Sequence, residues 1–147
     1  EKHSQSCDTK LAAIFNSINF TACLYEGVSE LLKALKTTSK VVIFTEGDHV
    51  YQKAKIEKSG LAKLVDEVLL FEHKMQHLGK LKKKFAGKKM IFVEDKADNL
   101  AHIKSAIPEA HTIIVCQGHY GKDFCDHSVK NNLFKPDRII EKVSELS

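Results

Sequence analysis

Residues 90–100 read MIFVEDKADNL, an apolar run that ends on two adjacent carboxylates, Glu94 and Asp95, with a third, Asp98, one helical turn later. Short continuous runs of β-branched and aromatic residues are typical of strands buried on both faces. Such runs occur at 41–45, 67–71, 89–93 and 111–116, and helical stretches separate them. Strands that alternate with helices form right-handed βαβ units. The sequence therefore predicts an α/β fold with a doubly wound, mainly parallel sheet.

The helical stretches are predicted from apolar residues that recur at helical spacing. Segments 10–20 and 26–36 are both expected to bury one face, and further helices are expected to start near His49, Met75 and Ala97. The last segment, 136–146, is amphipathic and places four apolar residues on one side: Ile139, Ile140, Val143 and Leu146. No internal repeat or low-complexity block interrupts the pattern, so we expect one compact unit.

Composition limits the classes of function. With 147 residues, 43% of them hydrophobic, the chain is long enough for one domain with a core of its own. The net charge of +4 can attract anions, but it falls short of the strongly basic signature of a nucleic-acid-binding protein. No apolar stretch reaches the roughly 18 to 20 residues of a membrane span, and the N-terminus has no signal-peptide core. We expect a cytoplasmic protein without a nucleic-acid or membrane partner.

The four cysteines contain no CxxC pair. Cysteines without a paired spacing in a protein of this class are more often reduced than bridged. We therefore expect free, partly buried thiols and no disulfide.

Polar residues follow each of the four expected strands. In parallel sheets of this type, ligands bind beyond the carboxyl ends of the strands, so these residues are expected to converge at one edge. They are Thr45, Glu46 and Gly47 after the first strand, Lys74 after the second, Glu94 and Asp95 after the third, and Gln117, His119 and Tyr120 after the fourth.

This set of side chains predicts a site for a phosphate and a metal ion. Thr45, with the amides of Glu46 and Gly47 at a helix start, can hold phosphate oxygens, because helix N-termini present unpaired donors. Lys74 can neutralise the phosphate as a compact point charge, and Asp95 offers the hard oxygen that Mg²⁺ prefers. The expected partner is a small phosphorylated substrate, and the loop 117–120 is a candidate lining of its pocket.

The ordered series of a strand ending in Thr45, an isolated Lys74, and a strand ending in Glu94-Asp95 with Asp98 beyond resembles motifs two, three and four of the haloacid dehalogenase-like hydrolases. The resemblance covers residues 26 to about 120. Two further stretches, 55–61 and 117–120, look like a little-characterised bacterial, phosphatase-like subgroup of that superfamily.

The resemblance implies a Mg²⁺-dependent phosphatase that works through an aspartyl-phosphate intermediate. Thr45 and Lys74 would be its catalytic phosphate-binding residues. Asp95 would face Mg²⁺, Glu94 would be a neighbouring ligand, and Asp98 would hold a metal-bound water. Residues 26–147 would be the α/β core, and 1–25 would be the remnant of a small helical cap.

The family's first motif, Asp-x-Asp at the end of a first, central strand, is absent from this sequence. The resemblance places that strand between the strands at 41–45 and 89–93, where its absence leaves unpaired edges. Because the sequence also begins with Glu rather than Met, we expect a fragment of a longer protein. An unfilled sheet position also leaves pairing with a second copy open, as a homo-oligomer.

Other interpretations remain. Acids at strand ends can simply cap the following helix, as we expect for Glu46 and Asp48. A phospho-receiver domain also uses acids, a Thr and a Lys, but there the acidic pair comes first. The fold also supports a non-catalytic binding or scaffold module, or another reaction of the same superfamily, such as dehalogenation.

Two metal sites and one nucleic-acid patch are weaker hypotheses. Cys116, His119, Cys125 and His127 can be drawn as a zinc site, although they lack the usual paired spacing. His73 and His77 lie four residues apart and can share a metal on a helix face. The lysine-rich run at 80–89 lacks the interleaved aromatic residues of a nucleic-acid-binding surface, and a solvated helix and turn is the simpler interpretation.

Overall fold

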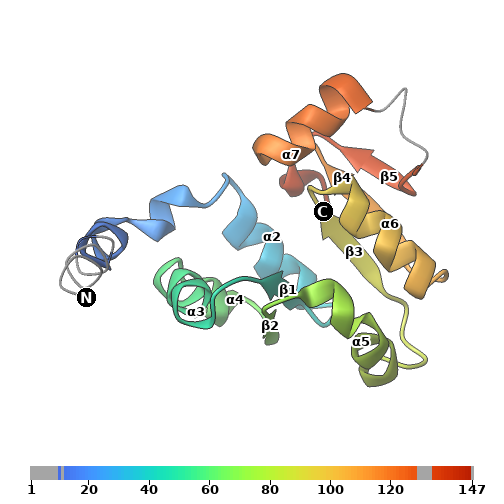
Figure 1. The fold of residues 1–147 in the computed structure, drawn as a ribbon, viewed down its shortest axis with the longest axis horizontal. Helices are drawn as coiled ribbons and strands as arrows, with labels where there is room; N and C mark the ends of the chain where they lie inside the picture. Colours follow the sequence, from blue (N-terminus) through green and yellow to red (C-terminus); the bar gives the residue numbers. More distant parts are fainter. Residues whose placement is uncertain (1–9, 11, 129–133, 147) are drawn as a thin grey trace, which may run out of the picture.

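The structure, a computed structural model, describes residues 10, 12–128 and 134–146. Strands and helices alternate along the chain, as predicted (Figure 1). The strands are β1 (Val42–Glu46), β2 (Glu67–Phe71), β3 (Ile91–Glu94), β4 (His111–Val115) and β5 (Arg138–Ile140). The α-helices are α2 (Val28–Leu35), α3 (His49–Lys58), α4 (Leu61–Leu64), α5 (Leu78–Lys84), α6 (Ala97–Ala106) and α7 (Gly118–Asp123). Shorter helical turns are η1 (Phe20–Cys23), η2 (Lys74–His77), η3 (Phe124–Ser128) and η4 (Val143–Leu146).

All the strand pairs among the described residues are parallel, which confirms the predicted α/β class. β1 pairs with β2, and β3, β4 and β5 pair in that order. The two sheets are separate: in the part of the chain that the structure describes, β1 and β3 each have a hydrogen-bonded neighbour on one side only. Figure 1 shows β1 and β2 in one half of the molecule and β3 to β5 in the other. The unpaired edges belong to the two strands between which the family resemblance places the missing strand.

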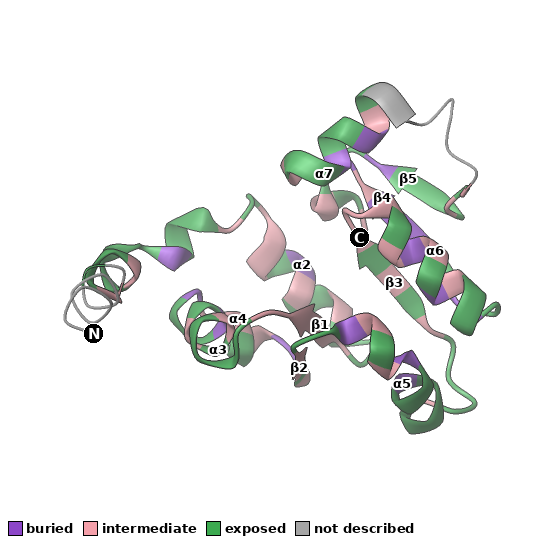
Figure 2. Cartoon of the chain, in the orientation of Figure 1, coloured by how far each residue is buried: buried purple, intermediate pink, exposed green. Residues whose placement is uncertain are grey.

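One apolar core joins the two halves. It is centred on α6, where Leu100 and Ile103 are almost completely buried, and it includes Ile114 of β4. Phe44 of β1 and Phe92 of β3 pack against this same cluster. Figure 2 shows buried positions along α6. Full burial of an aliphatic side chain of this size contributes roughly 1.5–3 kcal/mol. The helical layer of α5 and α6 therefore holds both sheets in place although the sheets do not touch through hydrogen bonds.

The opposite face of β3 is poorly covered. Ile91 is 60% exposed and Val93 is 39% exposed, whereas Phe92 between them points into the core. Side chains alternate between the two faces of a strand, so Ile91 and Val93 share one face. A strand at a sheet centre is normally apolar on both faces because both are covered. β3 thus has the sequence of a central strand in the position of an edge strand.

The C-terminal segment was predicted as an amphipathic helix, and that prediction is wrong for residues 138–140. These residues form β5, and only Val143–Leu146 is helical, as the 3₁₀ turn η4. The reason lies in Asp137, whose Oδ2 accepts hydrogen bonds from the Thr112 backbone N–H, the Thr112 hydroxyl and Lys104 Nζ, each at 2.8 Å. The Lys104 ammonium, followed by the two Thr112 donors, holds the pKa of Asp137 well below its usual range. This contact aligns the following residues with β4.

The expectation of four reduced cysteines is also wrong. Cys116, directly after β4, forms a disulfide with Cys125 in η3, and Cys23 is free and exposed. The turn of α7 brings the two sulfur atoms together across nine positions of sequence. The bond ties the loop 117–124 back onto the end of β4.

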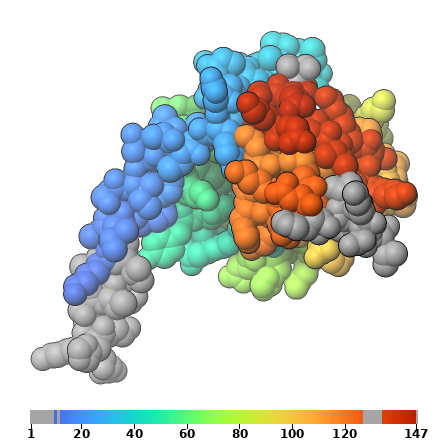
Figure 3. All heavy atoms as spheres, turned by 90° about the horizontal axis from the view of Figure 1, so that it is seen from above, coloured from blue at the N-terminus to red at the C-terminus, as the bar shows by residue number. Residues whose placement is uncertain are grey.

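The N-terminal segment extends from the body and lies along α3 (Figure 3). Residues 12–17 are helical, and the Phe15 ring packs on Tyr51 with 5.1 Å between ring centroids. Lys58 Nζ donates to Asn16 Oδ1 at 2.7 Å. Whether this segment is the remnant of a cap stays a prediction. No helix in the described part of the chain combines the length and the apolarity that crossing a membrane requires.

Candidate active site

Lys74 is the centre of the polar residues at the carboxyl edge. It begins η2, which two residues separate from the end of β2, and although it is a lysine it is only 7% exposed. Its Nζ lies 2.5 Å from Glu94 Oε2 at the end of β3, and its backbone N–H donates to Glu46 Oε2 at the end of β1, at 3.2 Å. A buried ammonium requires such a counter-charge. Lys74 therefore connects the ends of β1 and β3 across the unpaired edges.

The contact of Glu46 with Lys74 corrects one expectation. Glu46 was expected to cap the next helix, but its carboxylate binds the Lys74 amide instead. Asp48 performs the capping, because its Oδ1 accepts from the backbone N–H groups of Val50 and Tyr51. That half of the expectation is confirmed.

Thr45 lies at the end of β1 as predicted. Its hydroxyl oxygen accepts a hydrogen bond from Gln52 Nε2 at 2.8 Å, so Gln52 of α3 fixes the hydroxyl and leaves its proton free to donate. The Gly47 amide donates to Phe71 O at 3.0 Å, which extends the β1–β2 pairing by one residue. In this conformation that amide is occupied, so the Thr45 hydroxyl and Lys74 are the candidate donors to a phosphate on this side.

Asp95 follows β3 and is half-buried. Burial, together with a hydrogen bond and charge repulsion from the neighbouring Glu94, raises the pKa of Asp95 above its ordinary value. An ionised Asp95 is thus held in an unfavourable environment. A cation bound to Asp95 would relieve it.

The candidate metal ligands are only partly assembled. Asp98 is exposed in the first turn of α6, and Glu94 is engaged by Lys74. Among the described residues, no group of three His, Cys, Asp or Glu side chains is placed to hold a metal ion. Asp95 and Asp98 offer carboxylates that form no ion pair within 4.0 Å with another described residue, and of these two only Asp95 is half-buried. This fits Mg²⁺ in part, since Mg²⁺ uses one or two protein carboxylates and takes its other ligands from water and substrate phosphate.

The two other metal hypotheses find no support. The disulfide uses both cysteines of the drawn zinc site, and the side chain of His127 lies outside the described residues. The ring of His77 stacks on Phe71 at 4.1 Å between centroids. That contact packs one face of the His77 ring, and the buried Nδ1 of His77 has no hydrogen-bond partner among the described residues.

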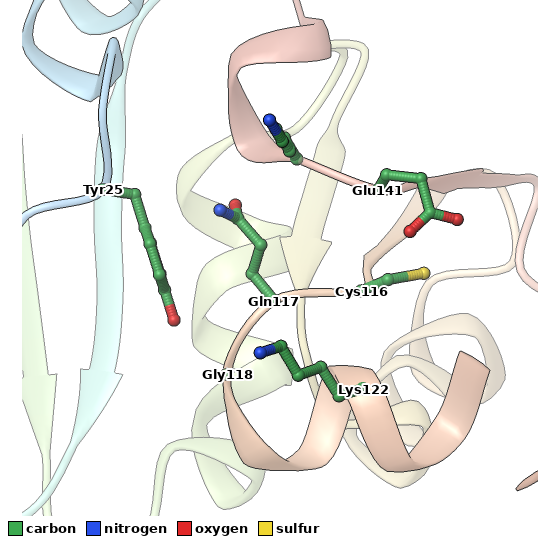
Figure 4. Close-up of a pocket in the computed structure, with 7 residues that line it drawn as sticks. Tyr25, Cys116, Gln117, Gly118, Lys122 and Glu141 are labelled. Carbon is green, nitrogen blue, oxygen red and sulfur yellow. The ribbon is translucent and has the colours of Figure 1, made fainter. Parts of the chain in front are cut away.

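Beyond Asp95, the loop after β4 borders a pocket of about 400 Å³ (Figure 4). Gly118 has a φ of +74°, and a Cβ there would lie 3.3 Å from Asp95 Oδ2 and 3.5 Å from the Tyr25 hydroxyl. Glycine thus permits both the backbone turn and the close approach of the acid and the phenol. The pocket is lined by Tyr25, Cys116, Gln117, Gly118, Lys122, Glu141 and Lys142.

The structure separates the predicted substrate loop into two parts. Gln117 lines the pocket, whereas His119 and Tyr120 do not; both are exposed, and Lys96 Nζ lies 4.4 Å from the centroid of the Tyr120 ring. Sequence reasoning missed Tyr25 and Lys122. Lys122 follows Gly118 by one helical turn, a spacing that could have indicated it, but nothing in the local sequence connects Tyr25 with this edge.

Comparison with known proteins identifies the fold. No family model and no curated protein sequence matches the chain. Its structure superposes on the crystal structure of a "putative haloacid dehalogenase-like hydrolase" from Burkholderia xenovorans LB400, with a TM-score of 0.84 and 28% sequence identity. The match covers 99% of this chain and 68% of that one. The chain belongs to the haloacid dehalogenase-like superfamily. It has the α/β fold of a hydrolase, and the order of Thr45, Lys74 and Glu94-Asp95 along the chain is that of the superfamily's later motifs.

Proposed function

We propose that this haloacid dehalogenase-like chain is part of a Mg²⁺-dependent phosphatase. The observation that supports this most is the burial of Lys74 at the carboxyl edge, between Glu46 of β1 and Glu94 of β3. A buried lysine that reaches across an unpaired sheet position is costly for stability alone, so a functional role is the better explanation of its burial. The half-buried Asp95, whose pKa is raised by burial and by Glu94, supports the proposal in the same way.

The chain's own residues have distinct tasks in this proposal. The Lys74 ammonium would neutralise the substrate phosphate, and the Thr45 hydroxyl, oriented by Gln52, would donate to a phosphate oxygen. Asp95 would hold Mg²⁺, with Glu94 close enough to contribute when Lys74 turns to the phosphate. Bound Mg²⁺ supplies charge neutralisation and orientation of the phosphoryl oxygens.

The nucleophile has to come from outside residues 1–147, because the sequence contains no Asp-x-Asp. A strand with that motif would fit between the free edges of β1 and β3, whose carboxyl ends Lys74 connects. Its carboxylates would then lie beside Lys74 and Asp95, at the carboxyl ends of the flanking strands. The N-terminal segment, residues 1–25, would be the remnant of a small helical cap.

The test is the phosphatase activity of the chain extended by the sequence encoded upstream of Glu1. We expect Mg²⁺-dependent hydrolysis of a generic phosphomonoester such as p-nitrophenyl phosphate. Asp95→Asn should abolish it, and Lys74→Ala should reduce kcat by roughly 100-fold or more, as for other removed transition-state contacts. Lys63→Ala, which removes an exposed lysine from α4, is the matched control and should leave kcat unchanged. Activity that is indifferent to the changes at Asp95 and Lys74 would refute the proposal.

The second candidate is a non-catalytic binding module, and the missing Asp-x-Asp favours it. In that case phosphate would raise the melting temperature of the chain without turnover of any phosphoester. Mg²⁺-dependent turnover by the extended protein would exclude it.

A further inference from the structure

The pocket beyond Asp95 presents hydrogen-bond donors with no assigned role. Gln117 Oε1 accepts from the Val143 backbone N–H at 2.7 Å. Because a backbone N–H can only donate, the oxygen of the amide must face Val143, and the nitrogen must face the other way. Figure 4 shows this nitrogen on the side toward Tyr25. Gln117 therefore directs one or two free donors into the pocket.

Lys122 supplies the charge. Its side chain rises from α7 into the same space (Figure 4), and its ammonium has no hydrogen-bond or ion-pair partner among the residues that the structure describes. Lys142 also lines the pocket, and the one acid in the lining, Glu141, turns its carboxylate away from Gln117 and Lys122. The hydroxyl of Tyr25 adds a neutral donor at the rim. The pocket therefore favours a negatively charged ligand group.

The pocket is contiguous with the proposed phosphate site. Gly118 separates the two by the width of one backbone turn, since its Cβ position is in contact with both the Asp95 carboxylate and the Tyr25 hydroxyl. A ligand held at Asp95 and Lys74 would extend past Gly118 into the pocket. A second anion on such a ligand would then meet Lys122 and Gln117.

We propose that Lys122, Gln117 and Tyr25 form a subsite for a second anionic group, so that the preferred substrate is a small phosphate monoester that also carries a carboxylate or another phosphate. The inference rests on the proposed function for the position of the first phosphate. It goes beyond that function because it specifies the substrate's charge and the residues that select it.

The experiment compares two non-hydrolysable probes of equal length in the presence of Mg²⁺. 3-Phosphonopropionate carries a carboxylate where propylphosphonate has a methyl group. Dissociation constants are measured by NMR titration of the ¹⁵N-labelled chain. We expect 3-phosphonopropionate to bind about fivefold or more tightly than propylphosphonate, the scale of a charge-assisted contact at a partly open site.

The variants assign this preference to residues. Lys122→Met should reduce the affinity for 3-phosphonopropionate to that for propylphosphonate, and it should leave the affinity for propylphosphonate unchanged. Tyr25→Phe should cause a smaller loss, about twofold, because only a neutral donor is removed. Lys63→Met in α4 removes the same charge elsewhere and should change neither affinity.

The outcomes separate the two proposals. Equal affinity for both probes, with sensitivity to Lys74→Ala, would overturn the subsite and leave the phosphate site standing. A preference for 3-phosphonopropionate that Lys122→Met removes, together with affinities for both probes that Lys74→Ala leaves unchanged, would support the subsite and contradict the proposed phosphate site. Absence of binding by either probe would overturn both.

Discussion

Lys74 and Asp95 lie at the same edge of the sheet in opposite electrostatic situations. Lys74 has its counter-charge, Glu94, at 2.5 Å, whereas Asp95 shares the edge with that same glutamate as a like charge. The folded protein therefore favours the protonated form of Asp95 more than the unfolded chain does. Sites built for ligands often keep groups that cost stability in the free protein, because the ligand supplies the missing interaction.

This cost predicts a pH-dependent effect of Asp95→Asn. Because the pKa of Asp95 is higher in the folded state than in the unfolded chain, its ionised form destabilises the fold, and stability falls as pH rises through that interval. Asparagine cannot ionise, so the variant should be more stable at pH 7 by about 0.5 kcal/mol, after allowance for solvent at this half-exposed site. That corresponds to roughly 2 °C in Tm.

The measurement is thermal unfolding of both proteins between pH 4 and pH 8. The gain should shrink as the pH falls, because wild-type Asp95 then becomes protonated as well. Asp98→Asn removes one negative charge from an exposed position on α6 and is the control. An equal gain in Asp98→Asn would attribute the effect to net charge and not to the environment of Asp95.

At this scale, the sequence identified residues that end strands and missed residues that reach the edge from elsewhere. Lys74 and Glu94 could be predicted to converge because each follows an apolar run, and parallel strands end at one edge. Tyr25 precedes α2, and only the packed fold brings its hydroxyl near Gly118. Such contacts depend on tertiary structure, which no local pattern encodes.

Among the elements, the loop 117–124 differs most from expectation. Residues 117–120 were predicted as a candidate substrate loop that follows a free cysteine, but the Cys116–Cys125 disulfide closes the segment into a small ring that carries Gln117 and Lys122. Spacing alone could not predict this bond, because nine positions separate the cysteines and their proximity depends on α7. β5 was missed for a related reason, because Ile139 and Ile140 fit a helical face with Val143 and Leu146. Only the hydrogen bonds of Asp137 to Thr112 at the start of β4 align residues 138–140 as a strand.

The disulfide should stabilise the fold measurably. Closing a loop of this length restricts the unfolded chain and contributes roughly 2–3 kcal/mol in the chain-entropy model. Cys125→Ser should therefore lower the free energy of unfolding in urea by about that amount. Reductant should destabilise the wild-type protein to the same level and leave Cys125→Ser unaffected. Cys23→Ser, at the exposed free cysteine, is the control, and wild-type stability that is indifferent to reductant would contradict the prediction.

At the scale of the whole molecule, the two halves share a core but not a sheet. The sequence predicted four of the five strands to within two residues at each end, because each is a continuous β-rich run. It also predicted the position of the gap, since the family resemblance places a strand between the first and third of them. What the residues could not determine is how β1 and β3 stay in place without it. The structure attributes this to α5 and α6, with Lys74 as the polar bridge.

The gap yields the last prediction, which concerns backbone protection. Successive N–H groups of a strand point to opposite sides, so about half of those in β1 and β3 face away from β2 and β4 and have no ladder partner. In the chain of 147 residues these amides should exchange with solvent far faster than those of β4, which is paired on both sides. In the protein extended upstream of Glu1, a strand inserted between β1 and β3 should slow their exchange by at least tenfold, while β4 stays unchanged. Amide-resolved hydrogen exchange by NMR measures both. Unchanged exchange in β1 and β3 of the extended protein would mean that no strand enters the sheet. Protection of the same amides only at high protein concentration would mean that a second copy of the chain covers the edges.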